Sequence, residues 1–114
     1  MNQLLTTVLE HPLFVPESFR LHQNYPNPFN PSTTIAFDMP TAGVAKLAVF
    51  NIIGQEIATL FDASVQPGRR LAVWNGMDRN GKMAGSGIYL IRFTASDQAG
   101  GRVHAETRKM MLVR

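Results

Sequence analysis

Three prolines within six positions constrain the early part of this chain more than any other feature. They lie in residues 23–34, which read QNYPNPFNPSTT and lead into the apolar run at residues 35–39. Proline fixes its own φ and pushes the preceding residue toward extended geometry, so this segment cannot be helical. Tyr25 and Phe29 in the same segment gain stability by packing against other residues. We interpret the segment as a stiff, ordered lead-in to a domain, because a flexible linker would be rich in Gly and Ser.

Short runs of β-forming residues, separated by turn residues, follow this segment. Residues 35–39 alternate apolar and polar side chains, which predicts a half-buried strand. Residues 44–52 are apolar almost throughout, so we expect a central strand that is covered on both faces. Phe19 and Leu21 suggest a first edge strand. Further strands are expected at residues 56–61, 69–74, 88–95 and 102–113.

Turn signals between these runs favour antiparallel pairing. Gly54 is free to adopt a positive φ between two runs, which predicts a β-hairpin, and Gln66-Pro67-Gly68 is a type II turn signal. No run leaves room for a parallel crossover. The sequence therefore predicts an all-β fold, an immunoglobulin-like antiparallel β-sandwich of about seven strands, formed by residues 16–114 as one domain.

Residues 1–15 have a different character. Leu4, Leu5, Val8 and Leu9 have helical spacing before Pro12, so a short amphipathic helix is expected there, in a linker or cloning remnant. This segment has no basic region and no cleavage pattern, and is not read as a signal peptide. No apolar stretch approaches the length of a membrane span, so membrane insertion is not expected. If the domain is exported, we expect the signal on a larger parent chain.

The composition argues against several classes of function. The chain has no cysteine, which excludes disulfides, thiolate metal sites and cysteine nucleophiles. The net charge of +3 is scattered, with only Arg69-Arg70 and Arg108-Lys109 as adjacent basic pairs, so no nucleic-acid partner is expected. His11, His22 and His104 lack metal-ligand spacing, and no metal is predicted. The acidic residues are dispersed and no serine lies in a nucleophile elbow, so we predict no catalytic residue, no enzyme activity and no cofactor.

Two features of the region around residues 74–87 leave alternatives open. The sequence Asp78-Arg79-Asn80-Gly81 is similar to the start of a calcium loop, but Gly87 occupies the position where such a loop has its acidic residue. The alternative is a turn in which Asp78 accepts hydrogen bonds from backbone N–H groups. Trp74, the single tryptophan, is either a core residue or a platform on which a sugar ring stacks.

Several motifs occur in a fixed order along the chain. They are the opening LHQNYPNPFNP at residues 21–31, VFNIIGQ at 49–55, WNG at 74–76 followed by Asp78 and Asn80-Gly81, SGIY at 86–89, and KMMLVR at 109–114. In this order they resemble the type A C-terminal sorting domains of the type IX, or Por, secretion system of Bacteroidota and relatives, over residues 17–114. Residues 74–93 are also similar to the immunoglobulin-like domain of flagellar hook-capping proteins.

The resemblance implies a non-catalytic sorting signal. Such a domain is carried by a larger exported protein, so the partners it implies are a covalently linked upstream cargo domain and the outer-membrane secretion machinery. It implies passage through the periplasm to the cell surface or the medium, and we expect a monomer. The chain is then expected to be a fragment of a larger secreted protein. The residues that carry the family motif, which we expect to be mainly structural, are Asn24, Tyr25, Pro26, Asn27, Pro28, Phe29, Asn30, Pro31, Gly54, Gln55, Trp74, Gly76, Gly87 and Tyr89.

The end of the chain is the candidate recognition site. We expect its basic and apolar residues to pair with the edge of a receptor sheet, which supplies backbone hydrogen bonds without a deep pocket. These residues are Arg108, Lys109, Met110, Met111, Leu112 and Val113. Tyr25 and Phe29 are expected to cap one end of the sandwich, or alternatively to contact the receptor. Two other functions stay open: a carbohydrate-binding module that uses Trp74, Tyr25 and Tyr89, and a passive spacer.

Overall fold

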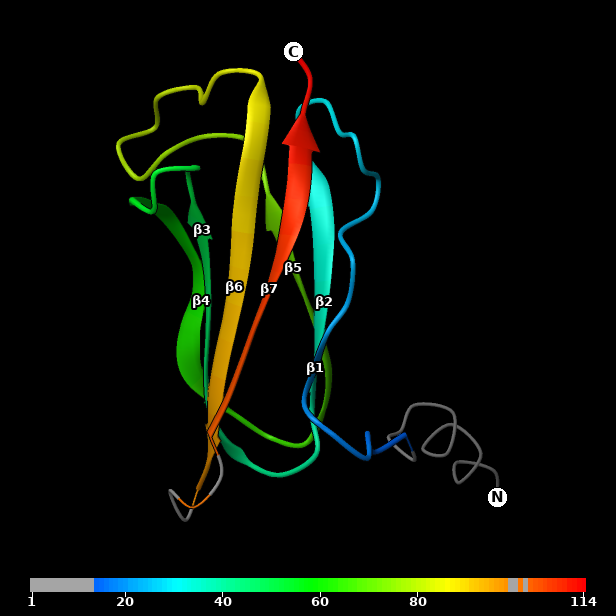
Figure 1. Ribbon diagram of the computed structural model, residues 1–114. Helices are drawn as coiled ribbons and strands as arrows, with labels where there is room; N and C mark the ends of the chain where they lie inside the picture. Colours follow the sequence, from blue (N-terminus) through cyan, green and yellow to red (C-terminus); the bar gives the residue numbers. More distant parts are fainter. Residues whose placement is uncertain (1–13, 99–100, 102) are drawn as a thin grey trace.

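The computed structural model describes residues 14–98, 101 and 103–114, and these form seven strands in two antiparallel sheets (Figure 1). This confirms the predicted all-β sandwich. The strands are β1 (Arg20–Leu21), β2 (Thr33–Met39), β3 (Gly43–Phe50), β4 (Glu56–Val65), β5 (Gly68–Trp74), β6 (Gly87–Asp97) and β7 (Val103–Leu112). The expected helix near the N-terminus, His11 and part of the turn at residues 100–102 lie outside the described residues.

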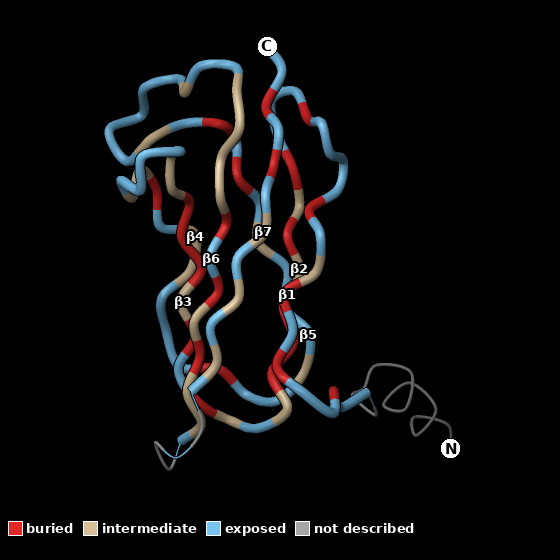
Figure 2. The backbone as a smooth tube through the Cα atoms, in the orientation of Figure 1, coloured by how far each residue is buried: buried red, intermediate tan, exposed pale blue. Residues whose placement is uncertain are grey.

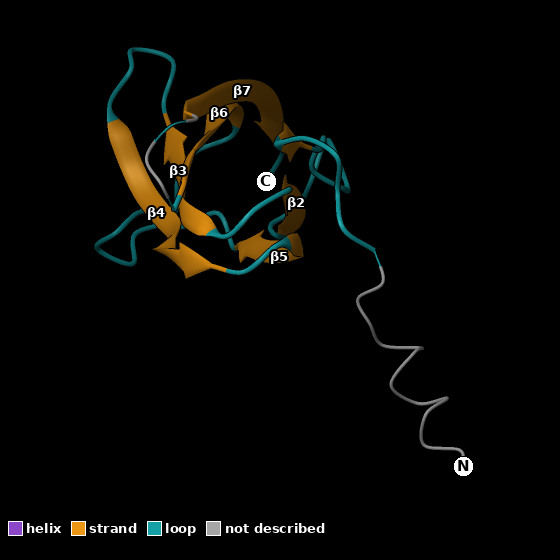
Figure 3. Cartoon of the chain, turned by 90° about the horizontal axis from the view of Figure 1, so that it is seen from below, coloured by secondary structure: helices purple, strands orange, loops and turns teal. Residues whose placement is uncertain are grey.

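The two sheets enclose one hydrophobic core. One sheet has the order β1-β2-β5 and the other has the order β4-β3-β6-β7. Viewed along the strands, the sheets curve around the core (Figure 3). Buried positions recur along the strands, while much of the surface at both ends is exposed (Figure 2). At the centre, the rings of Phe37 and Phe93 come from opposite sheets and lie 4.9 Å apart between centroids, a distance typical of a favourable aromatic pair.

The alternation of the sequence explains β2 and β5. In β2, Ile35, Phe37 and Met39 are fully buried. In β5, Leu71 and Val73 are exposed on one face, whereas Trp74 is buried on the other, as predicted. The apolar strand β3 lies between β4 and β6, so its prediction as a central strand is confirmed. The expectation that both of its faces are covered is wrong, because Val44 is 49% exposed on the face that points away from the second sheet.

Asp38 departs from this alternation, because it is buried in β2 on what should be the polar face. Its carboxylate accepts hydrogen bonds from Arg69 on β5 at 2.8 Å and lies 2.9 Å from the Nε2 atom of His22. Burial by itself raises the pKa of Asp38, but the interactions with Arg69 and His22 outweigh it, so the pKa lies below its ordinary value of 3.8. The buried charge therefore ties β2 to β5 and to the segment after β1.

Strand β4 differs from its prediction in length and regularity. It extends to Val65, beyond the expected end at residue 61, and its pairing with β3 shifts register twice, between Leu47 and Ala48 and between Val49 and Phe50. Each shift gives β4 an extra residue relative to β3, as in a β-bulge. A bulge breaks the two-residue period, so Leu60 and Phe61 are both only partly buried.

The turns around β4 agree with the sequence. Gly54 has a φ of 86° in the β3–β4 hairpin, and Gly68 has a positive φ after Pro67. In the hairpin, Asn51 accepts hydrogen bonds from the N–H groups of Ile53 and Gln55 with its side-chain oxygen. Among the residues that the structure describes, there is no helix that is long and apolar enough to span a membrane.

Candidate recognition site

The sequence motifs meet at one end of the sandwich, which we call the motif pole. It comprises residues 22–32, the turn at 51–55, the loop at 75–86 and the last residues of the chain, at the top of Figure 1. Strand register brings them together: Thr33 pairs with Trp74, Phe50 pairs with Leu90, and Gly87 pairs with Leu112. Four segments that are distant in sequence therefore form one surface.

Asn24 organises the proline-rich segment from the inside. It is 2% exposed, and its amide nitrogen donates to the Thr33 hydroxyl at 2.9 Å and to the Pro26 carbonyl at 3.1 Å. The Thr33 hydroxyl donates in turn to the same carbonyl at 2.8 Å. The backbone of Tyr25 exchanges two hydrogen bonds with Thr34. These bonds hold residues 24–34 as a closed loop, which confirms an ordered lead-in.

Phe29 attaches this loop to β7. Its N–H donates to the Met111 carbonyl at 3.0 Å, and its carbonyl accepts from the N–H of Val113 at 2.9 Å. Asn27 accepts from the N–H of Met111 through its side-chain oxygen, and the Gln23 amide donates to the carbonyl of Lys109. The outer edge of β7 is therefore already paired along this stretch, which contradicts the expectation that a receptor strand pairs there.

The two aromatic residues of the loop have opposite environments. Phe29 is 2% exposed and its ring lies 5.7 Å from that of Trp74, so it caps the core as expected. Tyr25 is 81% exposed and caps nothing, so the expectation that both rings cap the sandwich is wrong for Tyr25. Residues 22–32 thus have one aromatic ring inside the fold and one on the surface of the motif pole.

Trp74 is a core residue and not a sugar platform. It is 1% exposed, its indole N–H donates to the Met77 carbonyl at 2.9 Å, and its ring packs at 5.2 Å against that of Tyr89. The Tyr89 hydroxyl donates to the carbonyl of Gly85 at 2.7 Å. The pair therefore anchors both ends of the 75–86 loop to the core.

Gly76 allows the last residue of the chain to approach this loop. Its φ is +77°, and an added Cβ would lie 2.9 Å from the Arg114 guanidinium and 3.0 Å from the Pro31 carbonyl. Arg114 donates from that guanidinium to the carbonyls of Gly76 and Ala84, both at 2.6 Å, and its N–H donates to the Ser86 hydroxyl. Arg114 occurs in the sequence only as the last residue of the motif at 109–114, and its contacts with the 75–86 loop could not be predicted from that motif.

The Asp78 loop has the geometry of a turn. The carboxylate oxygen Oδ1 of Asp78 accepts from the N–H groups of Asn80 and Lys82, both at 2.9 Å. The N–H of Gly81 donates to the Asp78 carbonyl, and Gly81 has a positive φ. Within the described residues, no group of three or more His, Cys, Asp or Glu side chains could hold a metal ion. His22 pairs with Asp38, and His104 pairs with Glu106.

The six predicted recognition residues divide into two groups. Met110 and Leu112 are buried in the core, at 1% and 0% exposure. Lys109, Met111 and Val113 are exposed. Alternation along β7 thus leaves only every second residue available to a partner.

Arg108, the sixth of these residues, joins β7 to β1. Its Nε atom donates to the Leu21 carbonyl at 2.8 Å, while the Glu106 carboxylate accepts from the N–H of Leu21 at 2.9 Å. Burial alone raises the pKa of Glu106, but the hydrogen bond from the Leu21 N–H and the interactions with His104 and Arg108 lower it by more than burial raises it. The pKa of Glu106 therefore lies below its ordinary value of 4.5. The two side chains satisfy both backbone groups of Leu21, as a neighbouring strand would. We call this contact the Leu21 clasp.

The outer surface of the motif pole is apolar and basic. Seven of the large hydrophobic residues that are exposed in the structure lie on it, and Lys82 and Lys109 are exposed among them. Single exposed apolar residues are ordinary, but their gathering at one end of a small domain is typical of an interaction surface. The seven residues are Tyr25, Ile52, Ile53, Met77, Met83, Met111 and Val113.

Comparison with solved structures identifies similar folds. The chain superposes on part of dimeric latent PorU from Porphyromonas gingivalis with a TM-score of 0.66 and 18% identity, over 80% of this chain and 9% of PorU. FlgD from Xanthomonas campestris, a protein of flagellar hook capping, matches with a TM-score of 0.54 and 23% identity over 71% of this chain and 55% of that one. FlgD from P. aeruginosa matches with a TM-score of 0.56 and 13% identity over 72% and 67%. No protein-family model and no curated protein matches the sequence.

These similarities concern the fold. At identities of 13 to 23%, they establish a shared sandwich architecture. The chain spans about one tenth of PorU, at 9% of its length, and about half of the Xanthomonas FlgD, at 55%. Fold likeness by itself leaves function to be argued from the surface residues.

Proposed function

We propose that this chain is a non-catalytic sorting domain that directs a covalently linked cargo protein through a type IX secretion system. The observation that carries the proposal is the convergence of the ordered motifs at the motif pole, where they shape one exposed surface. The likeness to PorU supports it, because the sandwich is the fold that the family resemblance implies. The domain would act in the periplasm as a monomer and leave with its cargo for the cell surface or the medium.

The machinery would recognise the exposed side of the motif pole and not the backbone edge of β7. That edge is occupied by Phe29, Asn27 and Gln23. The side chains of Met111, Val113 and Lys109 remain exposed, as do those of Tyr25 and Met83. Exposed apolar residues on the same end of the domain as Lys82 and Lys109 suit an apolar receptor surface with acidic residues at its rim.

A secretion assay tests the proposal. Residues 16–114 are fused to the C-terminus of a periplasmic reporter in a host that has a type IX system. We expect the fusion to reach the medium or the cell surface, and the double variant M111D/V113D to be secreted at least about tenfold less per folded molecule. Leu71→Asp is the matched control, because Leu71 is 68% exposed on β5, away from the motif pole. A wild-type fusion that stays in the periplasm would contradict the sorting role.

The burial of the aromatic rings and the same reporter fusions also test the two other functions. A sugar platform needs exposed rings, but Trp74 is buried and Tyr89 is packed against it, which leaves Tyr25 alone. No observation therefore favours the carbohydrate-binding module. A passive spacer would leave the reporter in the periplasm with both the wild-type domain and the double variant.

A further inference from the structure

The sandwich is closed along one side and open along the other. On the closed side, residues 21–29 bond to β7 through Leu21 and Phe29. On the open side, β4 and β5 are each the last strand of their sheet, and no backbone hydrogen bond joins them among the described residues. A groove of about 620 Å³ lies between them.

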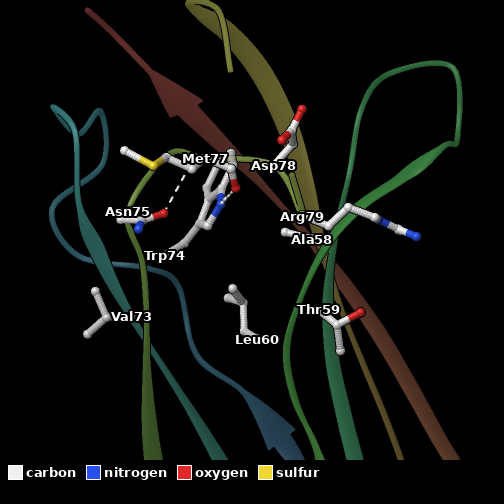
Figure 4. Close-up of a pocket in the computed structure, with 9 residues that line it drawn as sticks. All are labelled: Ala58, Thr59, Leu60, Val73, Trp74, Asn75, Met77, Asp78 and Arg79. Carbon is white, nitrogen blue, oxygen red and sulfur yellow. Dashed lines mark hydrogen bonds between the residues drawn. The ribbon is translucent and has the colours of Figure 1, made fainter. Parts of the chain in front are cut away.

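The walls of this groove combine apolar side chains with the polar residues Thr59, Asn75 and Asp78. Figure 4 shows Leu60 of β4 and Trp74 of β5 lying between the two strands, with Met77 above them. The bulges of β4 place Leu60 there, since it is the extra residue at one register shift. Trp74 is already enclosed, whereas Met77 is 37% exposed and Leu60 is partly buried. An extended chain that entered the groove would cover Met77 and Leu60 and remove them from water.

Strand β5 offers the better pairing edge. It pairs with β2 from Thr33 to Met39 without a register shift, so its free edge is regular over seven residues. The edge of β4 is bulged next to the groove, and the N–H of Arg79 already donates to the Ile57 carbonyl there. Bulges and covered carbonyls discourage strand addition, whereas a regular open edge permits it.

A cation without an acidic partner lies between β4 and β5 beyond the residues that line the groove. The Arg70 guanidinium reaches from β5 over the ring of Phe61 on β4, 5.2 Å from its centroid. Among the described residues, Arg70 forms no ion pair, unlike its neighbour Arg69, which binds Asp38. At the upper end, the Asp78 carboxylate is engaged by the N–H groups of its own loop. An incoming carboxylate would therefore find a charge partner in Arg70.

We propose that the open side binds an extended segment of a partner protein that presents apolar side chains and a carboxylate on one face. The segment adds to the free edge of β5 as a fourth strand, its apolar side chains lie in the groove beside Leu60 and Met77, and the carboxylate, farther along the same face, pairs with Arg70. Strand addition of this kind gives affinity through backbone bonds and specificity through alternate side chains. The inference concerns a different surface from the motif pole and does not require the sorting role.

Trp74 is the only tryptophan, so its fluorescence reports directly on the groove. The purified chain is titrated with a blocked hexapeptide in which two valines and one glutamate occupy alternate positions, so that they share one face, with threonine at the positions between. We expect a saturable change in fluorescence with a Kd of about 1 mM or below, a range that short peptides reach. Two matched peptides are used as controls, one with lysine in place of glutamate and one N-methylated at alternate backbone nitrogens. Each is expected to bind at least about tenfold more weakly.

Charge reversal completes the test. Arg70→Glu is expected to weaken binding of the glutamate peptide at least about tenfold, and Arg70→Gln is the alternative if the reversal impairs folding. Arg92→Glu is the control, because Arg92 is exposed on β6 in the other sheet. Absence of a saturable change up to about 10 mM peptide, equal binding of the N-methylated peptide, or undiminished binding to the Arg70 variant would each overturn the inference. A reporter that fails to leave the periplasm would count against the sorting role alone.

Discussion

Replacing Phe29 and Tyr25 by alanine, one at a time, separates the two parts that residues 22–32 play. An aromatic side chain buries roughly 200 Å² when it is fully enclosed, and each Å² is worth about 25 cal/mol. Phe29 is 2% exposed, so its truncation removes nearly all of this area. The resulting ceiling is about 5 kcal/mol, and measured Phe→Ala losses of about 3 to 5 kcal/mol agree with it. Tyr25 is 81% exposed, so the same reasoning limits its loss to about 1 kcal/mol.

Equilibrium unfolding in urea, followed by Trp74 fluorescence, measures both losses. Phe29→Ala is expected to lower the free energy of unfolding by about 4 kcal/mol, which is a large share of the roughly 5 to 15 kcal/mol of a typical domain. Tyr25→Ala should leave the midpoint almost unchanged, and should lower secretion of the reporter per folded molecule. A loss below about 1 kcal/mol for Phe29→Ala, or equal losses for the two variants, would refute the division of roles.

Three further predictions concern stability. Gly76→Ala should lower the free energy of unfolding in urea by about 2 to 3 kcal/mol, because Gly76 has a positive φ and an added Cβ would clash with the guanidinium of Arg114. Gly54→Ala, at φ 86° with no atom within 4 Å, should lower it by about 1 kcal/mol. Equal losses would contradict the close approach at Gly76. Glu106→Gln should lower the free energy of unfolding by about 1 to 2 kcal/mol at neutral pH, because it weakens the Leu21 clasp. The Leu21 N–H should then exchange faster in hydrogen-exchange NMR, and an unchanged exchange rate would refute the clasp. Because the pKa of Asp38 is lower in the fold than its ordinary value of 3.8, its contribution is complete above that value and is lost as the pH falls through the folded-state pKa. Asp38→Asn should therefore lower stability by about 1 to 3 kcal/mol at pH 7 and flatten the acid limb of a stability–pH curve; an unaltered limb would exclude Asp38 as its source.

Local patterns were sufficient to predict the central part of the fold. The alternation around Phe37 and the apolar run around Leu47 correspond to β2 and β3, although only one face of β3 is fully covered. The same reasoning failed in β4, where bulges shift the register at Leu60. A bulge depends on how β4 meets β3, and the two-residue period of β4 alone does not contain that information.

The candidate site was predictable as a set of residues but not as a surface. Tyr25 and Phe29 have the same setting in the sequence, each one residue away from a proline, yet one is exposed and the other is buried. The difference arises because Phe29 bonds to Met111 and Val113, more than eighty positions later. Asp38 is a similar case, since only its position beside Arg69 makes its burial tolerable.

The Leu21 clasp makes the start and the end of the domain depend on each other during folding. Arg108 and Leu21 are separated by 87 positions, and Met111 and Asn27 by 84. Contacts over such distances along a chain form late and slow folding, because loop-closure entropy must be lost before the contacts stabilise anything. During synthesis, residues 20–31 cannot complete their contacts until β7 has been made. The sandwich therefore closes along this side only after β7 has formed, so residues 20–31 reach their final packing later than the strands that lie between them and β7 in the sequence.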